Sequence, residues 1–127
     1  MRARILVVED NPMNLELVRD ILTAAGYEVL EAVDGATGVA VAVLERPDLI
    51  LMDLQLPGVD GFEATRQIRA NRDLASVPIV AVTAHAMKGD DEKARAAGCD
   101  GFITKPINVR EFSAEVARYL ERAKRSK

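Results

Sequence analysis

Residues 49–53 read LILMD, and this stretch is the strongest indication of the type of sheet. Its first four residues are apolar without interruption, and the fifth is an acid. A run that is apolar on both faces is typical of a strand covered by helices on both sides, as in a parallel sheet. Similar runs occur at Ile5–Val8 and Ile79–Val82, so we predict three buried strands, at these two segments and at Leu49–Met52.

Two further strands have a weaker apolar character, at Glu28–Ala32 and Gly101–Thr104, and we predict that they form the sheet edges. Strand and helix patterns alternate five times along the chain. This order predicts an α/β fold: a doubly wound, five-stranded parallel sheet, (βα)5, in a three-layer sandwich. The predicted helices are Pro12–Ala25, Asp34–Arg46, Gly61–Asn71, Asp90–Ala97 and Asn108–Lys124.

Residues suited to helix ends support these bounds. Asn11 and Asp34 can cap helices, and Pro12 is compatible with a first helical turn. Gly26 and Gly98 follow predicted helix ends, where a left-handed residue is common. The five helices therefore have plausible starts and stops.

Composition indicates one soluble domain over residues 1–127. Apolar residues make up 49% of the chain and charged residues 29%, and this length supports a core without disulfides. The single cysteine, Cys99, excludes an internal disulfide. No apolar run approaches the roughly 20 residues of a membrane helix, and the start is unlike a secretory signal. We expect a reducing, cytoplasmic location and a buried, inert Cys99.

The net charge of −3 gives no general attraction to nucleic acid or to anionic lipid. We therefore predict no nucleic-acid or membrane partner. Residues 122–127 form a basic tail, which we interpret as a solvated helix terminus; its cations are Arg122, Lys124, Arg125 and Lys127.

Polar side chains stand where the predicted strands end. Glu9 and Asp10 follow the first strand, Asp53 the third, Thr83 the fourth, and Lys105 follows the fifth. Ligands of doubly wound sheets bind beyond the carboxyl ends of the strands. Any one acid at a strand end is more often a cap or turn residue, but the ordered set indicates a site.

Three of these residues are carboxylates that converge if the first and third strands are neighbours. Glu9, Asp10 and Asp53 would then repel one another, which a cationic side chain or a hard divalent metal relieves. Mg²⁺ prefers oxygen ligands and keeps several waters. The pattern therefore predicts a Mg²⁺ site, with Lys105 as the neighbouring cation.

A carboxylate facing a metal, an ammonium and a hydroxyl can act as a nucleophile towards phosphorus. Asp53 is central, so we predict that it is the phosphoacceptor, with Thr83 and Lys105 contacting phosphoryl oxygens. Asp10 would bind Mg²⁺ directly and Glu9 through a water. The backbone carbonyl of Gln55 would complete the metal shell.

The whole chain resembles the receiver (CheY-like) domains of bacterial response regulators. It is similar to stand-alone members such as the chemotaxis and cell-division regulators, and one stretch also resembles receivers fused to hybrid kinases. The resemblance rests on Val7-Val8-Glu9-Asp10-Asn11, on Asp53 followed by Leu56-Pro57-Gly58 and Asp60-Gly61, on Thr83-Ala84 and on Lys105-Pro106.

The resemblance implies a single-domain response regulator with strand order 2-1-3-4-5. It implies phosphoryl transfer to Asp53 from the phosphohistidine of a histidine kinase or a histidine phosphotransfer protein. It further implies Mg²⁺ dependence and slow self-catalysed hydrolysis. Glu9 stands where many family members have aspartate, which lengthens the reach of this side chain.

Further roles also come from the resemblance. Phe102 matches the switch aromatic that turns inward when Thr83 moves, although filling the core is the alternative interpretation. Gln55 and His85 occupy positions that tune hydrolysis, and Pro106 follows a cis peptide bond. A role of His85 as phosphodonor or metal ligand is the weaker hypothesis.

The output is predicted to be a protein-binding surface. With no output segment after Lys127, another protein must read the signal, through Asp90–Ala97, Gly101–Thr104 and Asn108–Lys124. Gly89, several alanines and few large apolar residues predict that the first of these helices is among the less stable elements. We expect a monomer or weak dimer.

Two alternatives remain. Phosphatases of the haloacid dehalogenase kind also form an aspartyl phosphate with Mg²⁺, but they carry an acid two residues after the nucleophile, where this chain has Gln55. A flavodoxin-like flavin module shares the fold class but needs a phosphate-cradling loop after the first strand. Glu9 and Asp10 would repel that phosphate.

Overall fold

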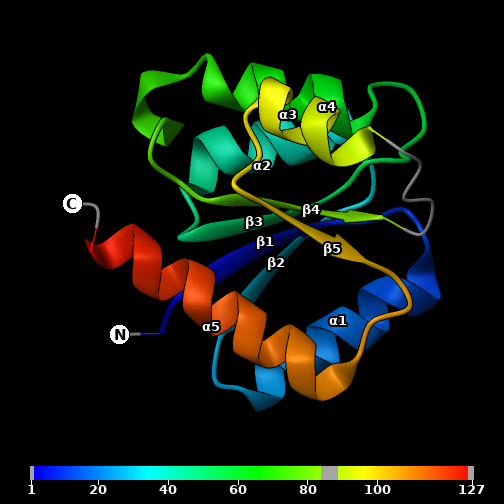
Figure 1. The fold of residues 1–127 in the computed structure, drawn as a ribbon, viewed down its shortest axis with the longest axis vertical. Helices are drawn as coiled ribbons and strands as arrows, with labels where there is room; N and C mark the ends of the chain where they lie inside the picture. Colours follow the sequence, from blue (N-terminus) through cyan, green and yellow to red (C-terminus); the bar gives the residue numbers. More distant parts are fainter. Residues whose placement is uncertain (1, 84–88, 126–127) are drawn as a thin grey trace.

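The computed structural model describes residues 2–83 and 89–125 (Figure 1). Strands and helices alternate, with one short 3-10 turn, η1, before the fourth strand. The elements are β1 Arg4–Val8, α1 Pro12–Ala24, β2 Glu28–Ala32, α2 Gly35–Glu45, β3 Leu49–Asp53, α3 Gly61–Arg69, η1 Arg72–Leu74, β4 Ile79–Thr83, α4 Asp90–Ala97, β5 Gly101–Thr104 and α5 Val109–Arg125.

The five strands form one parallel sheet in the order β2-β1-β3-β4-β5, which confirms the predicted topology. Every residue of β3 and β4 is buried, whereas β2 and β5 are only partly buried. The two weakly apolar strands are therefore the edges, as predicted. The register sets Val8 beside Met52 and Asp53 beside Val82, so the ends of β1, β3 and β4 lie next to one another.

Helices cover both faces of the sheet. In Figure 1, α2, α3 and α4 lie on one side, and α1 and α5 lie on the other. Successive strand residues alternate between the two cores: Ile50 packs towards α2–α4, and Leu51 packs towards α1 and α5. This alternation follows from the two-residue period of a strand and explains why the central runs are apolar without interruption.

Capping residues set the observed helix bounds. Asn11 and Asp34 accept hydrogen bonds from backbone N–H groups of the first turns of α1 and α2. The predicted helix at Gly61–Asn71 is too long, because α3 ends at Arg69. The Asn71 side chain accepts a hydrogen bond from the N–H of Asp73 and starts η1 instead.

The helices that flank β5 differ in their anchoring. Helix α4 follows Gly89, which provides no side-chain cap, and the buried residues of the helix are Ala94 and Ala97. Helix α5 buries Phe112 and Val116 and runs to Arg125, so the predicted basic tail begins as helix. Within the described ranges, no helix is long and apolar enough to cross a membrane.

Candidate functional site

Three carboxylates meet beyond the carboxyl ends of β1 and β3. Glu9 follows the last residue of β1, and Asp53 closes β3 on the neighbouring strand. One carboxylate oxygen from each of Glu9, Asp10 and Asp53 lies within 4.8 Å of the others. Glu9 and Asp53 are buried, while Asp10 is exposed. The predicted acidic cluster therefore exists, with one member facing solvent.

Lys105 supplies the positive charge of the cluster. Its Nζ lies 2.6 Å from Oε1 of Glu9 and 3.5 Å from Oδ2 of Asp53. The ammonium donates a hydrogen bond to Glu9, so its shorter contact is with Glu9 and not with Asp53. All three side chains are at most 10% exposed, which makes this a largely desolvated ion pair.

Backbone N–H groups hold the other oxygens of the two buried acids. The N–H of Asn11 donates to Oε2 of Glu9 at 3.3 Å, and the N–H of Gln55 donates to Oδ1 of Asp53 at 3.0 Å. Each carboxylate thus has one oxygen bound to the chain that follows its strand. The oxygen that remains faces Lys105.

Burial raises the pKa of Glu9 above its ordinary value. The nearby carboxyl of Asp53 raises it further, and the ammonium of Lys105 partly offsets both effects. The cluster is therefore short of positive charge, although Lys105 is already present. A second cation would relieve this repulsion.

Two neighbours limit the space around Asp53. Thr83 is fully buried at the end of β4, beside the end of β3. A Cβ on Gly61 would lie 2.2 Å from the backbone oxygen of Asp53, so only glycine allows α3 to begin this close. The start of α3 is thereby pressed against the loop that carries the acid.

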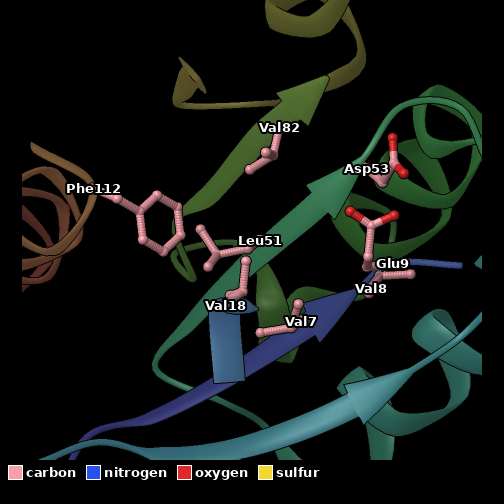
Figure 2. A pocket seen from close by; sticks show the side chains of 8 residues that line it. All are labelled: Val7, Val8, Glu9, Val18, Leu51, Asp53, Val82 and Phe112. Carbon is pink, nitrogen blue, oxygen red and sulfur yellow. The ribbon is translucent and has the colours of Figure 1, made fainter. Parts of the chain in front are cut away.

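A small cavity of about 10 Å³ lies directly under the acids, with room for about one water. Figure 2 shows the carboxylates of Glu9 and Asp53 beyond the tips of their strands and the ring of Phe112 across the cavity. Most of its apolar lining residues belong to the core under α1 and α5. It is lined by Val7, Val8, Glu9, Val18, Leu51, Asp53, Val82 and Phe112.

The structure brings most of the predicted site residues together. The carboxylates, Lys105 and the strand end with Thr83 share one edge of the sheet, and the Lys105–Pro106 peptide bond is cis. Phe102 is partly buried and packs against the core under α2–α4. Its switching role, the metal-binding role of the Gln55 carbonyl and the individual chemical roles remain predictions. His85 lies outside the described residues.

The sequence-based reasoning missed the pairing of Lys105 with Glu9. The prediction directed Lys105 towards Asp53 and the phosphoryl group, whereas the ammonium is closer to Glu9. The sequence did contain one signal for this contact: the side chain of Glu9 is one methylene longer than that of aspartate and therefore reaches further. The contacts from the N–H groups of Asn11 and Gln55 were also missed, because such contacts depend on loop geometry.

Comparison with known proteins identifies the class that this fold and acidic cluster define. Residues 5–117 match the family described as the response regulator receiver domain. The chain belongs to this family, whose members take part in two-component signalling and accept a phosphoryl group on an aspartate. The assignment favours the receiver hypothesis over the phosphatase and flavin-binding alternatives.

Individual relatives agree with the family. The polar-differentiation response regulator DivK of Brucella anthropi is 44% identical over 120 residues, which cover 94% of this chain and 98% of that protein. The receiver domain of a sensor histidine kinase from Pseudomonas aeruginosa PAO1 is 40% identical, with a TM-score of 0.89 over 95% of this chain and 99% of that one. That structure has a magnesium ion coordinated in its active site cleft. A CheY-like receiver from Methanospirillum hungatei JF-1 is 28% identical, with a TM-score of 0.94 and full coverage of both chains.

Proposed function

We propose that Asp53 accepts a phosphoryl group from the phosphohistidine of a histidine kinase or a histidine phosphotransfer protein, and that residues 1–127 act as one receiver unit. The observation that carries this proposal is the position of Asp53. It closes a central strand between the acids that follow β1 and Thr83 at the end of β4, with Nζ of Lys105 at 3.5 Å. Family membership supports the same role.

The transfer joins a carboxylate oxygen of Asp53 to phosphorus. The bond from phosphorus to the imidazole nitrogen of the donor breaks, and its electron pair stays with that nitrogen. The N–H of Gln55 holds Oδ1 of Asp53, so Oδ2 is the oxygen that we expect to attack. Thr83 and Lys105 then donate hydrogen bonds to phosphoryl oxygens and offset their charge.

The carboxylates fit a Mg²⁺ ion, because three hard oxygen donors lie within 4.8 Å of one another and Asp10 opens to solvent. Asp10 and Asp53 would hold the ion directly, Glu9 through a water, and the backbone carbonyl of Gln55 would complete the protein ligands. When bound, Mg²⁺ offsets the negative charge that gathers on the transferring oxygens. Water on the exposed Asp10 side would supply the remaining ligands.

The chain would also lose the phosphoryl group slowly, by attack of water on the aspartyl phosphate. Gln55 is exposed immediately beyond Asp53, where its side chain can influence the approach of water. We assign it, with His85, a modulating role. The activity is thus that of a signalling domain that catalyses its own phosphorylation and dephosphorylation.

The output would be a change in the surface formed by α4, β5 and α5. Thr83 ends β4, and its backbone oxygen accepts a hydrogen bond from the N–H of Lys105, which links the site to the end of β5. Phe102 lies on β5, next to the weakly anchored α4. The reader of this surface would be a protein, with the chain a monomer or weak dimer. A free, buried Cys99 fits action in the cytoplasm.

Labelling with radioactive acetyl phosphate and Mg²⁺ tests the proposal. The wild type should take up label, and Asp53→Asn should reduce it at least a hundredfold, because the amide is nearly isosteric but not an anionic nucleophile. Asp20→Asn removes an equal charge from an exposed position on α1 and should label as the wild type does. Undiminished labelling of Asp53→Asn would contradict the proposal.

A further inference from the structure

The largely buried ammonium of Lys105 has a partner that the phosphoryl chemistry does not require. Its hydrogen bond goes to Oε1 of Glu9 at 2.6 Å, while the nearest oxygen of Asp53 is 3.5 Å away. A lysine whose function is to meet a phosphoryl group on Asp53 is therefore held towards the neighbouring strand. This displacement needs a physical reason.

Burial makes this contact stronger than an ordinary surface ion pair. The side chains of Lys105 and Glu9 are 10% and 5% exposed, so little water is available to compete for the two charged groups. Exposed ion pairs are weak because water and salt screen them, and that screening is largely missing here. The ammonium also needs acceptors, because it carries three donors in a space with little solvent.

The length of Glu9 makes the contact possible. Its backbone N–H pairs with the carbonyl of Ala32 on β2, which fixes the residue at the end of β1. The additional methylene then carries the carboxylate out towards Lys105, while the N–H of Asn11 holds its second oxygen. An aspartate at this position would have a shorter reach.

The same carboxylates are the candidate ligands for a divalent cation. Glu9, Asp10 and Asp53 offer oxygens within 4.8 Å of one another, and Lys105 contacts two of these residues. Two cations that use one group of carboxylates repel each other and compete for the same oxygens. Each must therefore weaken the binding of the other, and this coupling is reciprocal.

We infer that Glu9 is the resting partner of Lys105: it holds the ammonium while the cluster is free of metal and releases it when the carboxylates bind a divalent cation. Release leaves the ammonium free to turn towards Asp53, where the phosphoryl group arrives. The inference rests on the proposed function, since it assigns the regulation of that same site. It makes Glu9 a positioning residue for Lys105 in addition to a metal-site residue.

A double-mutant cycle on Mg²⁺ affinity tests this exchange in the full chain, with MgCl2 as the only ligand. Lys105→Met keeps much of the side-chain volume but removes the competing charge, so affinity should rise about tenfold. Glu9→Asp deprives the ammonium of its partner and should raise affinity by a smaller factor. In the Lys105→Met background, Glu9→Asp should bring no increase.

Additivity is the result that would overturn the inference. If Lys105 acts only as a nearby charge, Glu9→Asp will change the affinity by the same factor with and without Lys105. The matched control is Lys93→Met, which removes an equal charge from an exposed position on α4 and should leave the affinity within about twofold of the wild type.

A second readout follows the ammonium directly. The NMR signal of the Lys105 side chain, assigned by its absence in Lys105→Met, should move as Mg²⁺ saturates the wild type. In Glu9→Asp it should begin near the metal-bound position and move little. A signal that stays fixed through saturation of the wild type would refute the exchange.

The metal site itself is tested separately by Asp10→Ala. This variant should lose most Mg²⁺ affinity while leaving the Lys105–Glu9 contact intact. Mg²⁺ binding that is unchanged in Asp10→Ala would contradict the metal site in the proposed function. If Asp10→Ala loses Mg²⁺ affinity as expected but the double-mutant cycle is additive, only the exchange of partners by Lys105 would be contradicted.

Discussion

Two partly buried cations flank β5, and they are bound in different ways. Arg69 lies at the amino end of β5 and donates to the backbone oxygens of Gly98, Leu74, Ala75 and Val77 and to the carboxylate of Asp100. Lys105 follows the carboxyl end of β5. It makes one hydrogen bond to Glu9 and a longer contact with Asp53.

The difference follows from the chemistry of the two side chains. Guanidinium is a planar group with five fixed donors, so Arg69 can join α3, η1 and the loop before β5 in one arrangement. Ammonium is a compact charge on a flexible chain and can exchange carboxylates without breaking a network. The amino end of β5 is thus joined by many fixed hydrogen bonds, whereas the carboxyl end carries the cation that changes partners in the proposed exchange.

The largest effect on stability should come from Arg69→Ala. The variant removes one donor from each of four carbonyl oxygens and from the carboxylate of Asp100, which keeps the N–H of Ile79. We expect a loss of about 3 kcal/mol in the free energy of unfolding. Urea denaturation measures it. Arg66→Ala, one turn away on α3 with an exposed ion pair, should cost less than about 0.5 kcal/mol. If Arg69→Ala and Arg66→Ala lost equal stability, the hydrogen bonds of Arg69 would not be the stabilising feature at the amino end of β5.

Lys105→Met should cost less, and Mg²⁺ should reverse the loss. Removing one partner of a buried ion pair leaves an uncompensated charge, and at this open edge of the sheet we expect a loss of about 2 kcal/mol. Urea denaturation in metal-free buffer and in millimolar MgCl2 distinguishes the two cations, since the loss in Arg69→Ala should persist in Mg²⁺. A Lys105→Met loss that is insensitive to Mg²⁺ would place Lys105 in the same structural class as Arg69.

Mg²⁺ should stabilise the wild type by about 1 kcal/mol when its concentration is about five times the dissociation constant. The cause is binding to the acidic cluster of the folded chain. Thermal melting with and without MgCl2 provides the measurement, and Asp10→Ala is the comparison that should show no shift. A shift of equal size in this variant would locate the ion elsewhere.

The smallest expected effect on stability comes from Asp34, an exposed carboxylate that lies at neither end of β5. The backbone N–H of Thr37 lowers the pKa of Asp34 from its ordinary value of 3.8. A lowered pKa means that Asp34 stabilises the fold above its unfolded pKa and loses this contribution as the pH falls through the folded pKa.

The stability advantage of the wild type over Asp34→Asn should therefore be present at neutral pH and be lost as the pH falls through the lowered pKa of Asp34. Urea denaturation across this range measures the difference. A difference that grows on acidification would have the wrong sign for this cap.

The fold was predictable because its signals are local and repeated. The apolar run at Leu49–Met52 has to be covered on both faces, and the capping side chains of Asn11 and Asp34 mark helix starts from sequence alone. The helix bound at Asn71 was wrong, because that side chain makes its own short turn with Asp73. Competition of this kind depends on geometry within a few residues.

The residues of the acidic cluster were predictable, but the distribution of its hydrogen bonds was not. Strand ends place Glu9 and Asp53 side by side, since the register follows from the parallel sheet. Which acid binds Lys105 depends on one methylene and on the loop after β5. The connection of Arg69 to four carbonyls is equally invisible in sequence, because backbone oxygens carry no residue signature.

The residue that carries the phosphoryl group can be identified chemically, and this measurement decides whether Asp53 is the phosphoacceptor. After incubation with acetyl phosphate and Mg²⁺, borohydride reduction converts an aspartyl phosphate into homoserine, and mass spectrometry of the peptides identifies the residue. We expect homoserine at position 53, and none when Mg²⁺ is withheld or when the chain carries Asp53→Asn. Homoserine at Asp10 instead, or a label that survives acid on a hydroxyl side chain, would contradict this role of Asp53.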